Sequence, residues 1–156
     1  MRAETICQIL LSSSLKRVHK TRLAAVWSAV TALLAGGVLA LTGLGRACEG
    51  KGKEKNYIKK MDRLLGNAHL SCERELFYRA MASILLRPEV QPIIAVDWTP
   101  WRDGFHAITA GLAIGGRCII FYGEVHPEKK LNNKNVNRGF LDALYRMLPT
   151  LSLIHI

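Results

Sequence analysis

The stretch that decides the fold is Ile93-Ile94-Ala95-Val96-Asp97-Trp98-Thr99. Its first four residues are apolar, which predicts a central strand buried on both faces of a sheet. Asp97 follows directly, at a place where a carboxylate loses hydration and stays ionised only if it is hydrogen-bonded, paired or bound to a metal. Two interpretations stay open. Asp97 either caps the following turn through the amides of Trp98 or Thr99, or it is a ligand for a hard cation such as Mg²⁺.

The residues after this stretch predict the rest of a small sheet and one helix. Residues 105–114 and 117–125 have the composition of strands, and Gly115-Gly116 between them is typical of a two-residue hairpin turn. From Val136 to Leu148 apolar residues recur at helical spacing, and Pro149 closes the pattern. The expected order is therefore strand, strand, strand, helix.

The residues before the stretch predict helices alone, at 23–34, 38–47, 56–65 and 73–86. Pro88 and Pro92 then interrupt the chain in a segment without periodicity, which indicates a linker. The expected fold class is α+β. We place a helical domain at residues 1–87, the linker at 88–92 and a second domain at 93–149.

Residues 23–45 carry no charge and are long enough to span a bilayer as a helix. A small membrane protein anchored by this segment is therefore one alternative. However, Gly36-Gly37 interrupts the run, which favours a helix, a turn and a second short helix in a cytoplasmic protein. A short helix after a turn, beside a basic run, is the layout of a helix-turn-helix module.

The chain has 156 residues with 22 Lys and Arg against 12 Asp and Glu, a net charge of +10. Residues 1–92 hold 15 basic and 7 acidic residues, whereas residues 93–156 hold 7 and 5. The excess therefore lies in the helical half and favours a polyanionic partner. The four cysteines are widely spaced, without a C-x-x-C pair, which indicates reduced thiols rather than a zinc site.

Seven basic residues lie between positions 46 and 63, in and before the helix expected at 56–65. Ile58, Met61 and Leu65 share one face of this helix, and cationic side chains gather on the opposite face. Such a helix can dock on a core and offer charge to phosphates, although a solvated charged face is the alternative. The residues expected to bind DNA are Arg46, Lys51, Lys53, Lys55, Lys59, Lys60 and Arg63.

Several segments resemble DDE transposases of the bacterial insertion-sequence type. The segment Pro92-Ile-Ile-Ala-Val-Asp97-Trp-Thr looks like their first catalytic strand, and Tyr122-Gly-Glu-Val-His-Pro-Glu-Lys-Lys-Leu-Asn-Asn133 looks like the end of the following hairpin. The helix with Arg138-Gly-Phe-Leu-Asp-Ala-Leu-Tyr-Arg-Met-Leu-Pro149 continues the pattern. Upstream, His19-Lys-Thr-Arg-Leu23 and Met61-Asp-Arg-Leu-Leu-Gly-Asn67 resemble their helical region that binds DNA ends. The similarity extends over roughly residues 8 to 149.

The resemblance implies a ribonuclease H-like catalytic domain behind an all-helical DNA-binding domain. It also implies strand cleavage and transfer by two metal ions, Mg²⁺ or Mn²⁺, held by three carboxylates. Asp97 matches the first carboxylate, and the other two would lie on elements beyond the last helix. We therefore expect an N-terminal fragment with an incomplete ribonuclease H-like domain, which binds no metal tightly. Its expected partners are transposon-end DNA and further copies of itself on that DNA, in the bacterial cytoplasm.

Two further expectations concern the end of the sequence and the single matching carboxylate. Leu151 to Ile156 fits neither the preceding helix nor a following strand, so residues 150–156 are expected to be a non-native tail. One carboxylate cannot hold two metals, so the chain should bind DNA without cutting it. The alternative from another class is a non-catalytic DNA-binding regulator that inhibits transposition by occupying the ends.

Overall fold

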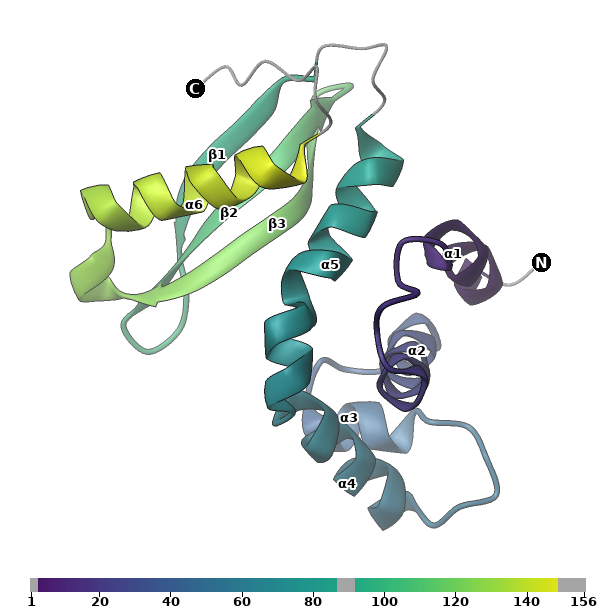
Figure 1. Ribbon diagram of the computed structural model, residues 1–156. Helices are drawn as coiled ribbons and strands as arrows, with labels where there is room; N and C mark the ends of the chain where they lie inside the picture. The colour runs from purple at the N-terminus through teal and green to yellow at the C-terminus, as the bar shows by residue number, and fades with distance from the viewer. Residues whose placement is uncertain (1–2, 87–91, 149–156) are drawn as a thin grey trace. The chain divides into compact units, whose positions relative to one another are not determined.

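The computed structural model describes residues 3–86 and 92–148, which divide into two units at the junction of Phe77 and Tyr78 (Figure 1). Over these residues the chain forms six α-helices and one three-stranded antiparallel sheet, so the expected mixture of helices and a sheet is confirmed. The division falls inside a helix. The predicted linker lies almost entirely outside the described residues, and so does the predicted tail at 150–156.

The first unit consists of helices. They are α1 (Ala3–Leu11), α2 (Lys20–Leu34), α3 (Leu41–Arg46), α4 (Glu54–Leu65) and the first part of α5 (Ala68–Leu85). Its core joins α2, α3 and α4 through Ala32, Leu44, Met61 and Leu64, all of them buried. Asn67 explains why α5 begins five residues before the predicted helix: its side-chain oxygen accepts a hydrogen bond from the Leu70 amide at 3.1 Å, as an N-cap does.

Gly36 and Gly37 end α2, as the sequence predicts. Gly36 has φ +90°, a conformation that glycine adopts without steric cost. A Cβ on Gly37 would lie 2.5 Å from the carbonyl oxygen of Ala32. Residues 23–45 therefore form two separate helices. Over the described ranges, every helix is too short or too polar to cross a membrane.

Helices α3 and α4 pack closely because Gly45 has no side chain. A Cβ at Gly45 would lie 2.5 Å from Cγ1 of Ile58 and 2.7 Å from its backbone nitrogen. Contacts this short do not occur between real side chains and backbone, so α4 can approach α3 this closely only at a glycine. The close pair fixes the orientation of α4, and with it the direction of the basic side chains on that helix.

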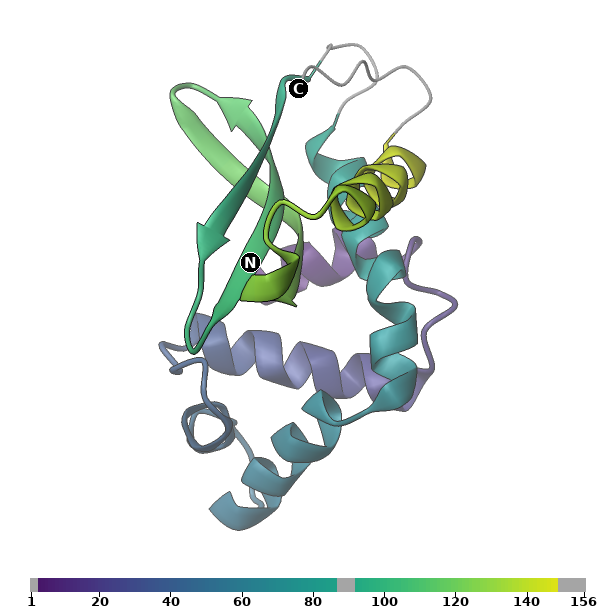
Figure 2. The same cartoon turned by 90° about the vertical axis from the view of Figure 1, so that its left-hand side faces the viewer.

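The second unit is a sheet with helices on one face. Strands β1 (Ile94–Pro100), β2 (Phe105–Ile114) and β3 (Arg117–Pro127) pair in the order β1-β2-β3, followed by a 3₁₀ turn, η1 (Glu128–Lys130), and by α6 (Lys134–Met147). Gly115 and Gly116 form the predicted hairpin turn with φ of 54° and 74°. Figures 1 and 2 show α6 across one face of the sheet. The core includes Ile94, Ile108, Phe121, Phe140 and Leu144, together with Ala82 and Leu86.

The expectation that residues 93–96 form a central strand buried on both faces is wrong for the part of the chain that the structure describes. Strand β2 is central, and β1 lies at the edge of the sheet. Ile94 is buried, whereas Ile93 and Ala95 are exposed. The physical reason is that helices cover only one face of the sheet, so the residues of β1 alternate between core and solvent. The strand also continues three residues beyond Asp97, to Pro100.

Candidate nucleic-acid interface

Helix α4 separates an apolar face from a cationic one. Met61 and Leu64 are buried against α2 and α3, whereas Leu65, which the sequence placed on the apolar face, is 65% exposed. On the opposite side Lys55, Lys59 and Arg63 recur every four residues and are exposed. They form a row about 12 Å long at 1.5 Å per residue. We call these three residues the α4 stripe.

The loop before α4 is held in place by a tyrosine. The amide of Gly52 donates a hydrogen bond to the hydroxyl of Tyr57 at 2.9 Å. A Cβ at Gly50 or Gly52 would lie within 3.0 Å of the same hydroxyl oxygen, so a side chain at either position would displace the end of the Tyr57 side chain. Lys51 and Lys53 are exposed on this loop. The anchored loop thus places two further cations beside the first turn of α4.

Two of the predicted DNA-binding cations are engaged within the protein. The Nε of Arg46 lies 2.9 Å from Oε1 of Glu54, and both side chains are largely exposed. Lys60 points toward α2, where its Nζ donates a hydrogen bond to the Ser28 hydroxyl at 2.6 Å. Lys60 lies 100° around α4 from Lys59, which turns it away from the stripe. In the described part of the chain, Lys51, Lys53 and the α4 stripe have no hydrogen-bond or ion-pair partner.

An ion pair joins α2 to α5 within the same unit. Nε of Arg22 donates to Oε2 of Glu73 at 2.7 Å, and Nη2 donates to the other carboxylate oxygen. Both side chains are mostly buried, at 19% and 16% exposed. The hydrogen bonds hold the pKa of Glu73 below its ordinary value and raise the pKa of Arg22. Arg22 is therefore a structural cation, unlike those of the α4 stripe.

Asp97 lies on the open face of the sheet. It is the fourth residue of β1, it is exposed, and its register partner on β2 is Thr109. Its neighbours Val96 and Trp98 pack against the core on the other face. Nothing in the described ranges pairs with the Asp97 carboxylate, and that includes the amides of Trp98 and Thr99. Neither the burial nor the turn cap that the sequence suggested is therefore found.

Glu124 lies on the face of the sheet opposite to Asp97. Thr109 pairs with both Asp97 and Gly123, so the next residue, Glu124, points to the other side. There its carboxylate accepts a hydrogen bond from the hydroxyl of Tyr122 and lies 3.0 Å from Nε2 of His126. Glu124 thus belongs to a network beneath α6 and cannot share a metal ion with Asp97.

The described residues alone do not make a metal site at Asp97. Among them, no three His, Cys, Asp or Glu side chains are grouped so that they could hold a metal ion. Mg²⁺ is held by protein carboxylates, waters and substrate phosphates in octahedral geometry. Asp97 is accessible and ionisable, so it fits as one ligand, but a single carboxylate does not fix two ions.

No protein-family model, no curated protein and no solved structure matches this chain. Its function is therefore inferred from the geometry of its own residues. Two residues that shape the interface were missed by sequence reasoning, Tyr57 and Ser28. The pair of glycines at 50 and 52 was a signal that the loop approaches a bulky group, although it did not show which one. No sequence pattern marks Ser28, because its contact with Lys60 depends on how α2 and α4 pack.

Proposed function

We propose that the first unit binds DNA through the α4 stripe and the loop before it. The observation that supports this proposal is a group of five exposed cations on one helix face and its adjoining loop: Lys51, Lys53, Lys55, Lys59 and Arg63. The backbone that carries them is held by close packing of α4 against α3 at Gly45 and by the hydrogen bond from Gly52 to Tyr57 in the loop. Cations carried on a backbone held in this way can neutralise phosphates and release counterions, and only their own side chains have to be ordered on binding.

The kind of partner that the interface can bind depends on its acidic residues as well as on the arrangement of its cations. Glu54 is already engaged by Arg46, so it subtracts little from the positive field of the loop and the stripe. A flat row of cations on a helix fits the backbone of a duplex better than it fits a single small anion, because phosphates recur along the strand. DNA is therefore the partner that we propose, with the ends of a mobile element as its specific target.

For the second unit we propose the beginning of a ribonuclease H-like domain of a DDE transposase. The antiparallel order β1-β2-β3, followed by a helix across one face, is compatible with such a domain. Asp97 on β1 would be one of the three carboxylates that hold Mg²⁺ or Mn²⁺ in the complete enzyme. There the metals would activate the attacking oxygen and stabilise the leaving oxygen of a phosphodiester. The role of Asp97 in this chain is limited to offering one ligand from an accessible strand.

The experiment is a binding and cleavage assay with the purified chain. A fluorescently labelled duplex carrying the end of the mobile element should bind, and binding should weaken steeply as salt is raised. Addition of Mg²⁺ or Mn²⁺ should give no cleaved strand. Failure to bind duplex DNA even at low salt would refute the proposed DNA interface. Robust cleavage that disappears in Asp97→Ala would refute the claim that this chain alone does not cut.

A further inference from the structure

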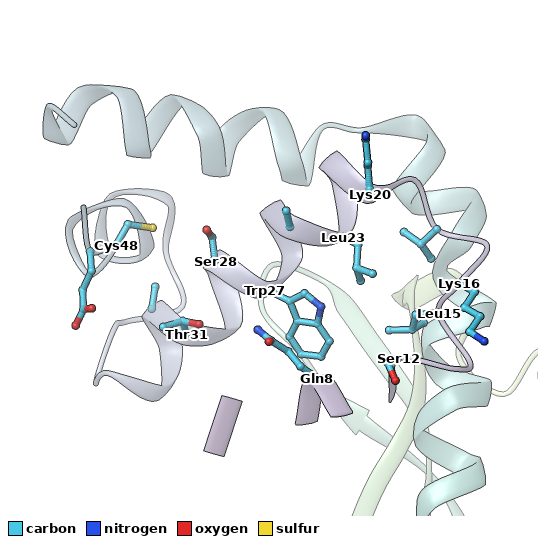
Figure 3. Close-up of a pocket in the computed structure, with 14 residues that line it drawn as sticks. Gln8, Ser12, Leu15, Lys16, Lys20, Leu23, Trp27, Ser28, Thr31 and Cys48 are labelled. Atoms are coloured by element: carbon cyan, nitrogen blue, oxygen red, sulfur yellow. The ribbon is translucent and has the colours of Figure 1, made fainter. Parts of the chain in front are cut away.

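The first unit contains a cavity of about 670 Å³ between α1, the loop at residues 12–19, α2 and the residues after α3 (Figure 3). This volume is within the range of small-molecule binding sites. Its floor is apolar, formed by side chains such as Leu15, Val18 and Leu23. None of the residues that line it belongs to the α4 stripe, so this cavity is distinct from the interface described above.

Trp27 supplies a flat aromatic surface in the middle of this cavity. Its indole ring extends from α2 toward Gln8 and Ser12 (Figure 3). The side chain is only partly buried, and within the described ranges its ring nitrogen donates no hydrogen bond. A tryptophan that served only the core would usually be enclosed, with its N–H paired. Trp27 instead leaves both a ring face and a donor to whatever enters the cavity.

Two lysines and one glutamate are among the residues that line the cavity. Lys16 and Lys20 lie near the start of α2, with their amino groups directed outward and apart in Figure 3, and Glu49 follows Cys48 in the chain. Both lysines are exposed and unpartnered among the described residues. A planar ring can lie on Trp27, and an anionic group attached to it can be met by these lysines at the rim, because their long side chains are exposed and can turn toward it.

Hydroxyl groups on α2 complete the lining. Ser28 and Thr31 both face the cavity, and the Ser28 oxygen already accepts a hydrogen bond from Lys60. Because that acceptor site is engaged by a cation, the Ser28 hydroxyl hydrogen is directed elsewhere and can be donated to a ligand. Donors and acceptors at this position suit the polar edge of a heterocyclic base.

We propose that this cavity binds a nucleotide, with the base stacked on Trp27 and the phosphate at Lys16 and Lys20. Two sources share this chemistry, a free mononucleotide and an unpaired nucleotide in a DNA strand. Only the second source rests on the function proposed above. The free-nucleotide source would be a separate binding activity of the first unit.

The first test uses adenosine 5′-monophosphate with the full chain in a calorimetric titration. Binding should weaken about tenfold in Trp27→Leu and much less in Trp27→Phe, because phenylalanine keeps an aromatic face. Lys16→Gln combined with Lys20→Gln should weaken binding by a similar factor and abolish the preference for the monophosphate over adenosine. Arg17→Gln is the matched control, since Arg17 is exposed on the same loop but does not line the cavity.

The second test uses DNA strands that contain 2-aminopurine, whose fluorescence falls when it stacks on an aromatic ring. Quenching at an unpaired position, lost in Trp27→Leu, would support the DNA source, and binding of the free monophosphate would support the other. The proposal is overturned if neither ligand responds to the Trp27 variants or to the surface variants at Lys16 and Lys20. Duplex binding that persists in that case leaves the proposed DNA interface standing, so the two failures are distinguishable.

Discussion

Gly45 is the residue at which one added methyl group should matter most. In Gly45→Ala the new Cβ would meet the backbone of Ile58, so α3 and α4 must move apart. Overpacking of this kind costs about 1–3 kcal/mol of unfolding free energy. Gly66→Ala is the control in the same unit, because its Cβ would meet its nearest neighbour at 3.4 Å and its φ is −81°. Urea unfolding followed by circular dichroism measures both, and equal stabilities of the two variants would contradict the close packing at Gly45.

Glu73 makes the stability of the first unit depend on pH. Its pKa is lowered in the folded state by the hydrogen bonds from Arg22, so its contribution is present above the ordinary glutamate pKa of about 4.3. That contribution is lost as the pH falls through the lower, folded-state pKa. We expect Glu73→Gln to be less stable than the wild type at neutral pH, and the difference to shrink on acidification.

Thermal unfolding of Glu73→Gln and the wild type across the acidic range checks this prediction. Glu49→Gln is the control, because Glu49 is exposed and unpartnered among the described residues. A difference between Glu73→Gln and the wild type that stays constant down to strongly acidic pH would show that the ion pair is not its source.

At the scale of the element, α4 carries an acidic residue, Asp62, beside its row of cations. Asp62 borders the α4 stripe, since it lies one residue from Arg63 and three from Lys59, and it is exposed. Its negative charge opposes the approach of phosphates. Asp62→Asn should therefore tighten binding of duplex DNA several-fold at low salt, and the gain should shrink at high salt as the field is screened. Fluorescence anisotropy measures the affinity.

The control for Asp62→Asn is Asp142→Asn on α6, which removes one exposed carboxylate from the other unit. If both variants tighten binding equally, only net charge matters and the proposed location of the interface is wrong. If Asp62→Asn has no effect at all, phosphates do not approach α4.

The secondary-structure elements were more predictable from the sequence than the burial and direction of their side chains. The hairpin around Gly115-Gly116 and the break at Gly36-Gly37 follow from local backbone preferences, and the structure confirms both. The burial of β1 could not be predicted, because a run of four apolar residues does not show whether one or both faces of the sheet are covered. The prediction that Lys60 binds DNA did not account for its hydrogen bond to Ser28, for a similar reason. Periodicity gives the angle of a residue around a helix, whereas packing decides which cations point toward a neighbouring helix.

At the scale of the whole molecule, charge and chemistry are divided between the two units. Residues 1–77 contain 13 basic and 6 acidic residues, and the remaining residues contain 9 and 6. The first unit carries the α4 stripe, the cations of the loop before it and the cavity beside Trp27, whereas the second carries Asp97 on an accessible strand. Composition alone predicted a polyanionic partner for the first half. Only the structure shows that Arg22, Arg46 and Lys60 are already engaged by ion pairs or hydrogen bonds within the protein.

The measurement that tests the central claim most directly is the salt dependence of duplex binding by the triple variant Lys55→Gln, Lys59→Gln, Arg63→Gln. Each phosphate contact contributes a slope of about −0.9 to the logarithm of affinity against the logarithm of salt concentration. We predict that the triple variant loses about three units of slope. The matched triple variant Arg117→Gln, Lys129→Gln, Lys130→Gln, which removes three exposed cations from the second unit, should keep the wild-type slope. An unchanged slope in the α4 variant, or an equal loss in both variants, would contradict the claim that α4 contacts DNA.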